Sequence, residues 1–579
     1  ADMSAVGNQG AFADGLVDRI IHMLTLSPEL AVVARTSSFA FRNTDAGIGE
    51  IAEKLDVDTV LEGSVQHSAD QVRVLAQLIN AKTEKHIWSR SYDRPLGELF
   101  ALQDEIANEV ARTLTDTLLP VRDTPHADSQ KVWELVTRGR LALDLFTLES
   151  ATKASEHFRQ ALELQPDSVE ALVGMVDALS VQRSLGPYGS SAIGEDITEP
   201  YLQRARRLAP DSAMVARITA DWHFNNARPE EAIAEYRRAI AIKPNAAWAH
   251  RKLGRVLFRQ TRYDDAIEPL RTAARLDPFS GLGKVWLADA YWAVGRAEEA
   301  MYRLRQAIED LPDFPQAHDR LATYLAQTGE IGRAMRHILH ARKLDPDSPR
   351  RWFRVCEFWL QLGDDAQAER CTNALLDEHD LPHYGRYLRQ IIHSFRDEWE
   401  ANQRELEAIY ATNQRDPLTR MLLAQSYSRT DCPRALEILG EFFPELFTDR
   451  PEVNPTLVLA AKTGVYCMQQ TGDAKQAELL FKAFSEVVAR TRNERGPWLV
   501  SGIEPAWVHA LNGDYDAALG VLEELVADDW RYYWWGLESY PSFAPIVDDP
   551  RFIELNERLR EGVRQQREWF EANRDEPLT

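Results

Sequence analysis

Cysteine, basic residues and long apolar runs are all scarce in this sequence of 579 residues. Its four cysteines are too few for a disulfide scaffold, and their spacing resembles no zinc site. We expect Cys356 and Cys371 on the two paired helices of one repeat, where they could approach each other, and Cys432 and Cys467 are spread in a similar way. The preferred interpretation is buried free thiols, and the alternative is a disulfide.

Basic residues are outnumbered by acidic ones, 67 to 90, which gives a net charge of −23. This excess argues against broad contact with nucleic acid or an anionic membrane, because neutralising phosphates requires surplus Lys and Arg. A local basic patch is still compatible with this negative net charge. No run approaches the roughly 18 consecutive apolar residues of a membrane helix, so no span is predicted, and we recognise no signal peptide.

Catalytic motifs are absent as well. The sequence contains no Gly-x-x-x-x-Gly-Lys-Ser/Thr loop, no His-Glu-x-x-His and no Gly-x-Ser-x-Gly elbow. His337 with His340, and His379 with His383, have helical spacing but lack a carboxylate or thiol partner at metal distance. We therefore predict no enzyme, no cofactor and no metal site.

What the chain does contain is proline at a fixed interval. Five prolines follow one another every 34 residues: Pro210, Pro244, Pro278, Pro312 and Pro346. Pro166 precedes the series by 44 residues, one period plus about ten, and a Gly/Ser-rich stretch at 186–191 lies in that gap. A period of 34 residues is typical of tetratricopeptide (TPR) repeats, in which helix pairs stack into a solenoid that binds partners.

Small residues recur with the same period where the paired helices should approach closely. The first helices carry Ala142, Ala220, Gly254, Ala288 and Ala322, and the second helices carry Ala154, Ala232, Ala266, Ala300 and Ala334. Larger apolar residues alternate with them, as helix stacking at short distance requires. Beyond Pro346 the pattern continues in degenerate helix pairs, and an aromatic cluster at 530–535 with a final helix is typical of a solenoid cap.

The first 120 residues have a different pattern. Helical periodicity covers 12–26, about 47–55 and 96–119, while β-rich runs cover 30–34, 59–66, 71–79 and 86–92. This alternation predicts a small α/β module.

Six segments of this module carry a resemblance to a known family. They are Phe12-Ala-Asp-Gly-Leu16, Ala34-Arg-Thr-Ser-Ser-Phe39, Val60-Leu-Glu-Gly-Ser-Val65, Val74-Leu-Ala-Gln-Leu78, Tyr92-Asp-Arg94 and Phe100-Ala-Leu-Gln-Asp-Glu-Ile106. Together they resemble the TolB amino-terminal-like domain, which commonly precedes TPR arrays in bacterial signalling proteins. The resemblance implies the sensory half of a CadC/ToxR-type winged-helix regulator or of a class III adenylate or guanylate cyclase. Members usually begin with an apolar strand before Ala1, so we expect that strand, and any effector or anchor, to be missing from this chain.

The candidate binding residues lie on the first helices of the repeats, which line the concave face of a TPR solenoid. They are Arg217, Asp221, Trp248, Arg251, Arg255, Phe258, Arg259, Asp289 and Trp292. Arginines one turn apart share a helix face and their planar groups suit carboxylate or phosphate, while the aromatic residues suit binding hot spots. The hypothesis is an anionic ligand such as an acidic peptide, and the alternative is that Asp221 and Asp289 neutralise the arginines.

These observations predict a mainly α fold, a TPR-type α-solenoid with a small N-terminal α/β domain. The expected divisions are 1–120 for the α/β domain, 128–348 for six regular repeats, and 349–579 for degenerate pairs and a cap. The predicted function is a non-catalytic sensor or scaffold region that binds a protein or peptide partner, and a homodimer is one arrangement it could adopt. The alternatives are a free-standing assembly factor of the cell envelope or secretion machinery and, less favoured, an enzyme with a cryptic site in the α/β module. A bacterial protein is expected, in the cytoplasm or periplasm, and membrane-associated if a missing segment anchors it.

Overall fold

The computed structural model describes residues 17, 20–21, 32–33, 37–38, 41, 44, 46–55, 57–68, 71–95, 127–144, 148–185, 197–278, 280–378, 382–412, 414, 416–491, 502–576 and 578. The chain divides into two compact units, Ala1–Gly283 and Lys284–Thr579, and each is treated by itself below. The predicted boundaries at residues 120 and 348 instead separate the α/β region, the regular repeats and the degenerate repeats, and they stay a prediction. None of the described helices is both long and apolar enough to cross a membrane.

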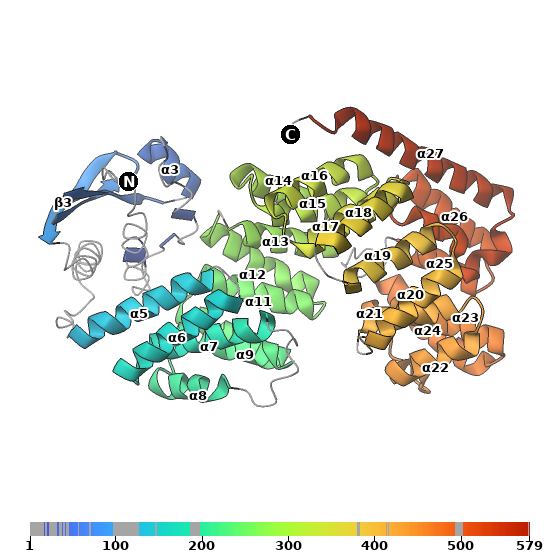
Figure 1. Cartoon of the computed structure of the whole chain (residues 1–579), viewed down its shortest axis with the longest axis horizontal. Helices are drawn as coiled ribbons and strands as arrows, with labels where there is room; N and C mark the ends of the chain where they lie inside the picture. The colour runs from blue at the N-terminus through green and yellow to red at the C-terminus, as the bar shows by residue number, and fades with distance from the viewer. Residues whose placement is uncertain are drawn as a thin grey trace. The chain divides into compact units, whose positions relative to one another are not determined.

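The first unit begins with a three-stranded antiparallel sheet and a short helix (Figure 1). Helix α3 (Ile48–Leu55) precedes strands β1 (Thr59–Ser68), β2 (Gln71–Asn80) and β3 (Lys85–Pro95), which pair in the order β1-β2-β3. Alternation buries Val74, Ala76 and Leu78 on one face of β2. The predicted helix at 47–55 and the strands at 59–66, 71–79 and 86–92 are confirmed. The elements predicted at 12–26, 30–34 and 96–119 lie wholly or mostly outside the described residues.

Four helix pairs complete the first unit. They are α5 (Ala127–Asp144) with α6 (Leu148–Leu164), α7 (Val169–Leu185) with α8 (Glu199–Leu208), α9 (Ala213–Asn225) with α10 (Pro229–Ile242), and α11 (Ala247–Arg259) with α12 (Tyr263–Leu276). Each second helix ends two residues before a periodic proline, because proline lacks the N–H that would continue the helix. The sequence period therefore marks the helix ends.

The second unit continues the same architecture. Its helices are α13 (Gly281–Ala293, at the border), α14 (Ala297–Asp310), α15 (Pro315–Gln327), α16 (Ile331–Leu344), α17 (Pro349–Gln361), α18 (Asp365–Glu378), α19 (Pro382–Phe395), α20 (Trp399–Thr412), α21 (Pro417–Tyr427), α22 (Cys432–Phe442), α23 (Val458–Thr471), α24 (Ala474–Thr491), α25 (Glu504–Leu511), α26 (Tyr515–Ala527) and α27 (Pro550–Asn573), with short 3₁₀ turns η3 (Pro444–Phe447), η4 (Pro455–Leu457), η5 (Trp534–Ser539) and η6 (Pro541–Ile546). The mainly α, TPR-type solenoid with a small N-terminal sheet is confirmed.

Small residues hold the paired helices close. A Cβ atom at Gly254 would lie 2.5 Å from Cγ of Leu270, and Ala220 is fully buried. The first pair departs from the prediction, since Ala142 is only half-buried and Gly139 is the residue that faces Phe158. The extra length of α5 moves this contact by about one helical turn.

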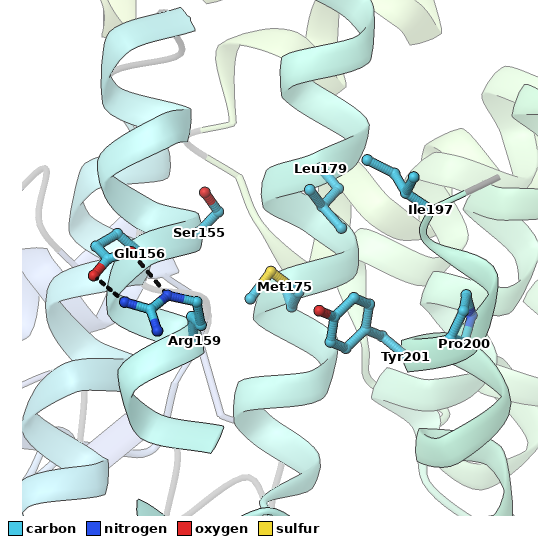
Figure 2. Close-up of a pocket in the computed structure, with 8 residues that line it drawn as sticks. All are labelled: Ser155, Glu156, Arg159, Met175, Leu179, Ile197, Pro200 and Tyr201. Atoms are coloured by element: carbon cyan, nitrogen blue, oxygen red, sulfur yellow. Dashed lines mark hydrogen bonds and ion pairs between the residues drawn. The ribbon is translucent and has the colours of Figure 1, made fainter. Parts of the chain in front are cut away.

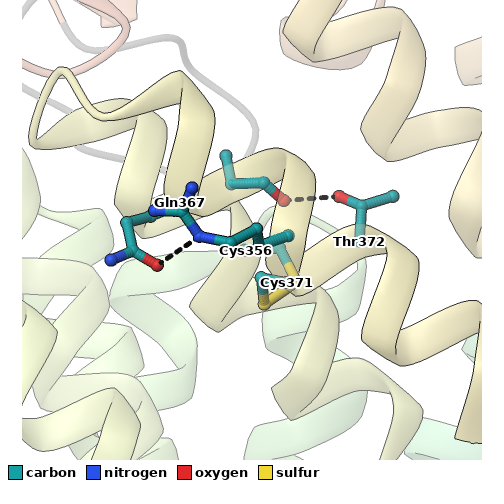
Figure 3. Close-up of a disulfide and its surroundings, with 6 residues drawn as sticks. Cys356, Gln367, Cys371 and Thr372 are labelled. Atoms are coloured by element: carbon teal, nitrogen blue, oxygen red, sulfur yellow. Dashed lines mark hydrogen bonds between the residues drawn. A yellow bond between two sulfur atoms is a disulfide. The ribbon is translucent and has the colours of Figure 1, made fainter.

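Cys356 and Cys371 form a disulfide between α17 and α18, with their Cα atoms 5.3 Å apart (Figure 3). Our preference for free thiols at this pair was wrong, and the alternative is correct. Paired antiparallel helices bring the two positions within the Cα separation that a disulfide needs. Cys432 and Cys467 are free thiols.

Candidate functional site

Three arginines lie four residues apart on α11. Arg255 and Arg259 are exposed, whereas Arg251 is half-buried and donates from Nη1 to Oγ of Ser280 at 3.0 Å. Partial burial of the Arg255 side chain among its neighbours lowers its pKa, as does the charge of Arg259, while Tyr236 and Asp221 oppose this shift. Burial also lowers the pKa of Arg251, the charge of Asp277 opposes this shift, and Arg255 adds to it. Positive charges are therefore crowded on this face, and a bound carboxylate would relieve their repulsion.

Arg217, by contrast, is neutralised within the solenoid. Its guanidinium contacts Asp177 of α7 at 2.6 Å and Asp221 at 3.0 Å, while Nζ of Lys252 contacts Asp221 at 2.9 Å. Burial raises the pKa of Asp221, but Lys252 and Arg217 outweigh it and the net shift is downward. These two predicted site residues serve the packing of successive first helices.

Asp289 and Trp292 are also structural. Asp289 is 9% exposed, lies 2.9 Å from Nε of Arg320 and accepts a hydrogen bond from the Tyr324 hydroxyl at 2.5 Å. Trp292 is 2% exposed and stacks in parallel on Tyr324, with 4.0 Å between ring centroids. The Trp292 ring is buried against Tyr324 of α15 in the following repeat, so in this structure it is covered, and its predicted contact with a ligand stays a prediction.

The ion pairs between first helices follow a repeating rule. A cation at one repeat position pairs with an acid at one position of the preceding repeat: Lys252 with Asp221, and Arg320 with Asp289. In the next repeat Thr323 takes the place of the acid, and Arg354 donates to its hydroxyl at 2.8 Å. Arg255 occupies in α11 the position that Asp221 and Asp289 occupy in their repeats. An arginine thus replaces the acid of the rule. Asp221 neutralises Arg217, as the predicted alternative holds, and it also attracts the charge of Arg255.

Two predicted aromatic residues flank the α11 arginines. Trp248 and Phe258 are half-buried, and the Phe258 ring lies 5.1 Å from that of Tyr263. The guanidinium of Arg259 lies 5.9 Å from the centroid of the Phe224 ring on α9. These partly open rings can pack against an apolar side chain beside an anion.

In the second unit, a segment of the chain itself contacts the repeat positions that Arg255 and Arg259 occupy on α11. Three repeats after Arg255 and Arg259, the same positions of α17 are Glu357 and Gln361. The hydroxyl of Tyr533 donates to Glu357, and its backbone N–H donates to Oε1 of Gln361 at 3.0 Å. The indole of Trp534 donates to the Gln361 carbonyl at 3.2 Å. The chain's own aromatic segment therefore occupies this part of the α17 face.

A cavity of about 530 Å³ opens between α6, α7 and the start of α8 (Figure 2). Met175 and Leu179 of α7, with Tyr201 of α8, form its apolar side, and Glu156 and Arg159 of α6 form a polar edge. Helix α8 begins four residues later in its repeat than α10 does, so about one helical turn is absent there. We did not predict this cavity, although the 44-residue proline interval marked its place. Its volume suits a small amphipathic group or an apolar side chain.

No group of three His, Cys, Asp or Glu among the described residues is arranged to hold a metal ion. The α11 arginines supply cationic groups and no nucleophile paired with a base.

Comparisons with known proteins identify the repeats. A TPR repeat model matches residues 228–261, and a tetratricopeptide repeat model matches 251–318. The chain therefore contains TPR repeats, a class that builds protein-interaction surfaces.

The chain is 34% identical over 174 residues to "Putative adenylate cyclase 3" of Rhizobium meliloti (strain 1021). The match covers 29% of this chain and 30% of that protein, so it spans less than a third of either. Among solved structures, the chain is similar to MamA (19% identity, 30% of this chain and 93% of that one, TM-score 0.26). It is also similar to YrrB, a TPR protein with an unusual peptide-binding site (17% identity, 32% and 95%, TM-score 0.25).

Proposed function

We propose that this chain is the partner-binding region of a bacterial signalling protein, and that α11 binds an acidic peptide segment of a protein partner. The observation that carries the proposal is the Tyr533 segment on Glu357 and Gln361. On α17, these two repeat positions hold a turn of the chain at Tyr533 through side-chain and backbone hydrogen bonds. On α11 the same positions are Arg255 and Arg259, so the complementary segment is acidic.

A titration with defined peptides tests this proposal. The probe is a fluorescent peptide in which Glu and Asp alternate with Tyr and Leu, and its control has Gln and Asn at the acidic positions. The chain should bind the acidic probe, and Arg255→Glu with Arg259→Glu should weaken binding by about tenfold or more, measured by anisotropy. Arg262→Glu with Arg271→Glu changes the charge equally on α12, where both arginines already pair with acids. That control should keep the affinity within about twofold. Equal loss in both variants would reduce the effect to net charge and contradict the proposal.

The second part of the proposal is that binding is passed to an effector domain, and the cyclase name of the partial relative favours a nucleotide cyclase. The TolB-like assignment of 1–120, homodimerisation and the compartment belong to the same proposal. The gene region that precedes the codon of Ala1 tests the choice of role. A cyclase or winged-helix domain encoded there supports the sensor, whereas a secretory or lipoprotein signal supports the envelope assembly factor.

A further inference from the structure

The second pair of cysteines lies between two successive helix pairs of the second unit. Cys432 is the first residue of α22 and is partly exposed, whereas Cys467 on α23 is fully buried. The two thiols share a side-chain hydrogen bond, and the Cys432 thiol also approaches the Ser428 carbonyl at 3.6 Å. The helices that carry them pack against each other within one hydrophobic core.

The environment gives the two thiols different chemical roles. The hydrogen bond from Cys467 lowers the pKa of Cys432, and the same bond, with burial, raises the pKa of Cys467. Cys432 also sits at the N-terminus of α22, where the unpaired backbone N–H groups favour a thiolate. The accessible cysteine is thus the nucleophile, and the buried one is the thiol placed to resolve it.

We propose that Cys432 and Cys467 form a modification site, a thiol pair that a small disulfide oxidant such as oxidised glutathione converts into a second disulfide. The Cys432 thiolate attacks one sulfur of the oxidant and releases a thiolate, which leaves a mixed disulfide on Cys432. Cys467 then loses its proton and attacks Sγ of Cys432, so that the second thiol of the oxidant departs. Two protein thiols are oxidised, and one disulfide of the oxidant is reduced to two thiols.

The chain already contains the matched comparison. Cys356 and Cys371 are bonded and link the two helices of one pair. A bond from Cys432 to Cys467 would instead link α22 to α23, helices of neighbouring pairs. Oxidation would therefore join repeats that otherwise associate only by packing, and a reducing thiol would reverse it. This inference does not depend on the proposed peptide binding.

The test uses the purified chain with its Cys356–Cys371 bond intact, incubated with oxidised glutathione. The wild type should lose both remaining thiols, retain no glutathione, and yield a linked Cys432–Cys467 peptide in a non-reducing digest. Cys467→Ser should retain one glutathione on Cys432, whereas Cys432→Ser should leave Cys467 unmodified. Alkylation of Cys432 by iodoacetamide should shift to higher pH in Cys467→Ala, since the hydrogen bond that favours the thiolate is lost.

Three results would overturn the inference. One is a stable glutathione adduct on Cys432 of the wild type, and another is no reaction of Cys432 in the folded chain. The third is a digest in which Cys467 is linked to Cys356 or Cys371. The alkylation profile covers the case in which a serine variant folds poorly, because Cys467→Ala replaces the buried thiol with an apolar group.

Discussion

The Ser37 hydroxyl donates a hydrogen bond to Oδ1 of Asp277 at 2.5 Å, across 240 residues of sequence. Both side chains are buried, and Ser37 lies in the Ala34–Phe39 segment that resembles the TolB amino-terminal-like domain. Asp277 caps the C-terminus of α12 and attracts the charge of Arg251. Within the first unit, the N-terminal module is therefore tied to a residue that acts on the α11 arginines.

Replacing Ser37 with Ala should loosen this connection. The buried Asp277 carboxylate loses a donor, and hydrogen bonds to charged groups are worth about 1.5–3 kcal/mol. Hydrogen exchange of the β1–β3 amides should become faster, while exchange in α15–α16 should stay unchanged. Ser91→Ala removes an exposed hydroxyl from β3 and is the control. Equal exchange in Ser37→Ala and the wild type would show that the contact does not hold the module.

Gly254 should tolerate no side chain. A Cβ atom there would lie 2.5 Å from Cγ of the fully buried Leu270 and 3.2 Å from the carbonyl oxygen of Ala266. Gly254→Ala should lower the free energy of unfolding by about 1–3 kcal/mol, measured by urea denaturation. Gly520→Ala in α26, where a Cβ meets nothing within 4 Å, should raise it by about 0.5–1 kcal/mol. A gain at both glycines would mean that α11 and α12 are less closely packed than described.

The contrast between Gly254 and Trp292 shows what the sequence could predict. Spacing alone located the helix ends and the small residues of the regular repeats, although not that of the first pair, because a 34-residue period repeats one local geometry. It also placed Cys356 opposite Cys371, although not as a bonded pair. It could not foresee that Trp292 is covered or that Tyr533 occupies α17, since Tyr533 and Glu357 are 176 residues apart. Contacts of that range depend on how many pairs stack, which no single repeat encodes.

Three histidines form a cluster between α15 and α16. Nδ1 of His318 lies 3.0 Å from Nδ1 of His337, and the His340 ring lies 4.6 Å from that of His318. Nε2 of His318 contacts the Pro312 carbonyl at 3.0 Å. Burial lowers the pKa of His337 to about 3, with His318 and Arg336 adding repulsion, and burial also lowers the pKa of His318.

This cluster should make the second unit sensitive to acid. The unfolded chain binds protons at His337 from pH 6.5 downward, whereas the folded chain does so only near pH 3. Stability should therefore fall as pH drops through this range, by about 2.5 kcal/mol between pH 7 and roughly pH 4.5 from His337 alone. His337→Gln should flatten the pH dependence of urea unfolding between pH 7 and 4.5, and His509→Gln, at a half-exposed site, should not. An unchanged slope in His337→Gln would place the acid sensitivity elsewhere.

Lys462 on α23 is a buried ammonium site, 5% exposed, and its Nζ has no hydrogen-bond partner among the described residues. Nζ lies 4.3 Å from the Trp507 ring centroid and 4.4 Å from that of Tyr540, so the charge rests against two aromatic faces. Burial lowers the pKa of Lys462 to about 7, and Glu504 opposes the shift without cancelling it. Ring contacts compensate only part of the lost hydration.

Lys462→Met should therefore stabilise the second unit at neutral pH. The unfolded lysine stays protonated up to pH 10.5, whereas the folded lysine releases its proton near pH 7. At neutral pH, folding therefore costs the free energy of either burying the charge or removing the proton. Methionine fills a similar volume without that cost, and we expect a gain of about 1–3 kcal/mol in urea unfolding near pH 7. The gain should shrink as the pH rises from 7 toward 10.5, because removing the proton from the unfolded lysine then costs less free energy. Lys482→Met, on the solvent side of α24, is the control and should change little at either pH. A loss of more than about 1 kcal/mol in Lys462→Met near pH 7 would show that the contacts of the ammonium outweigh its dehydration.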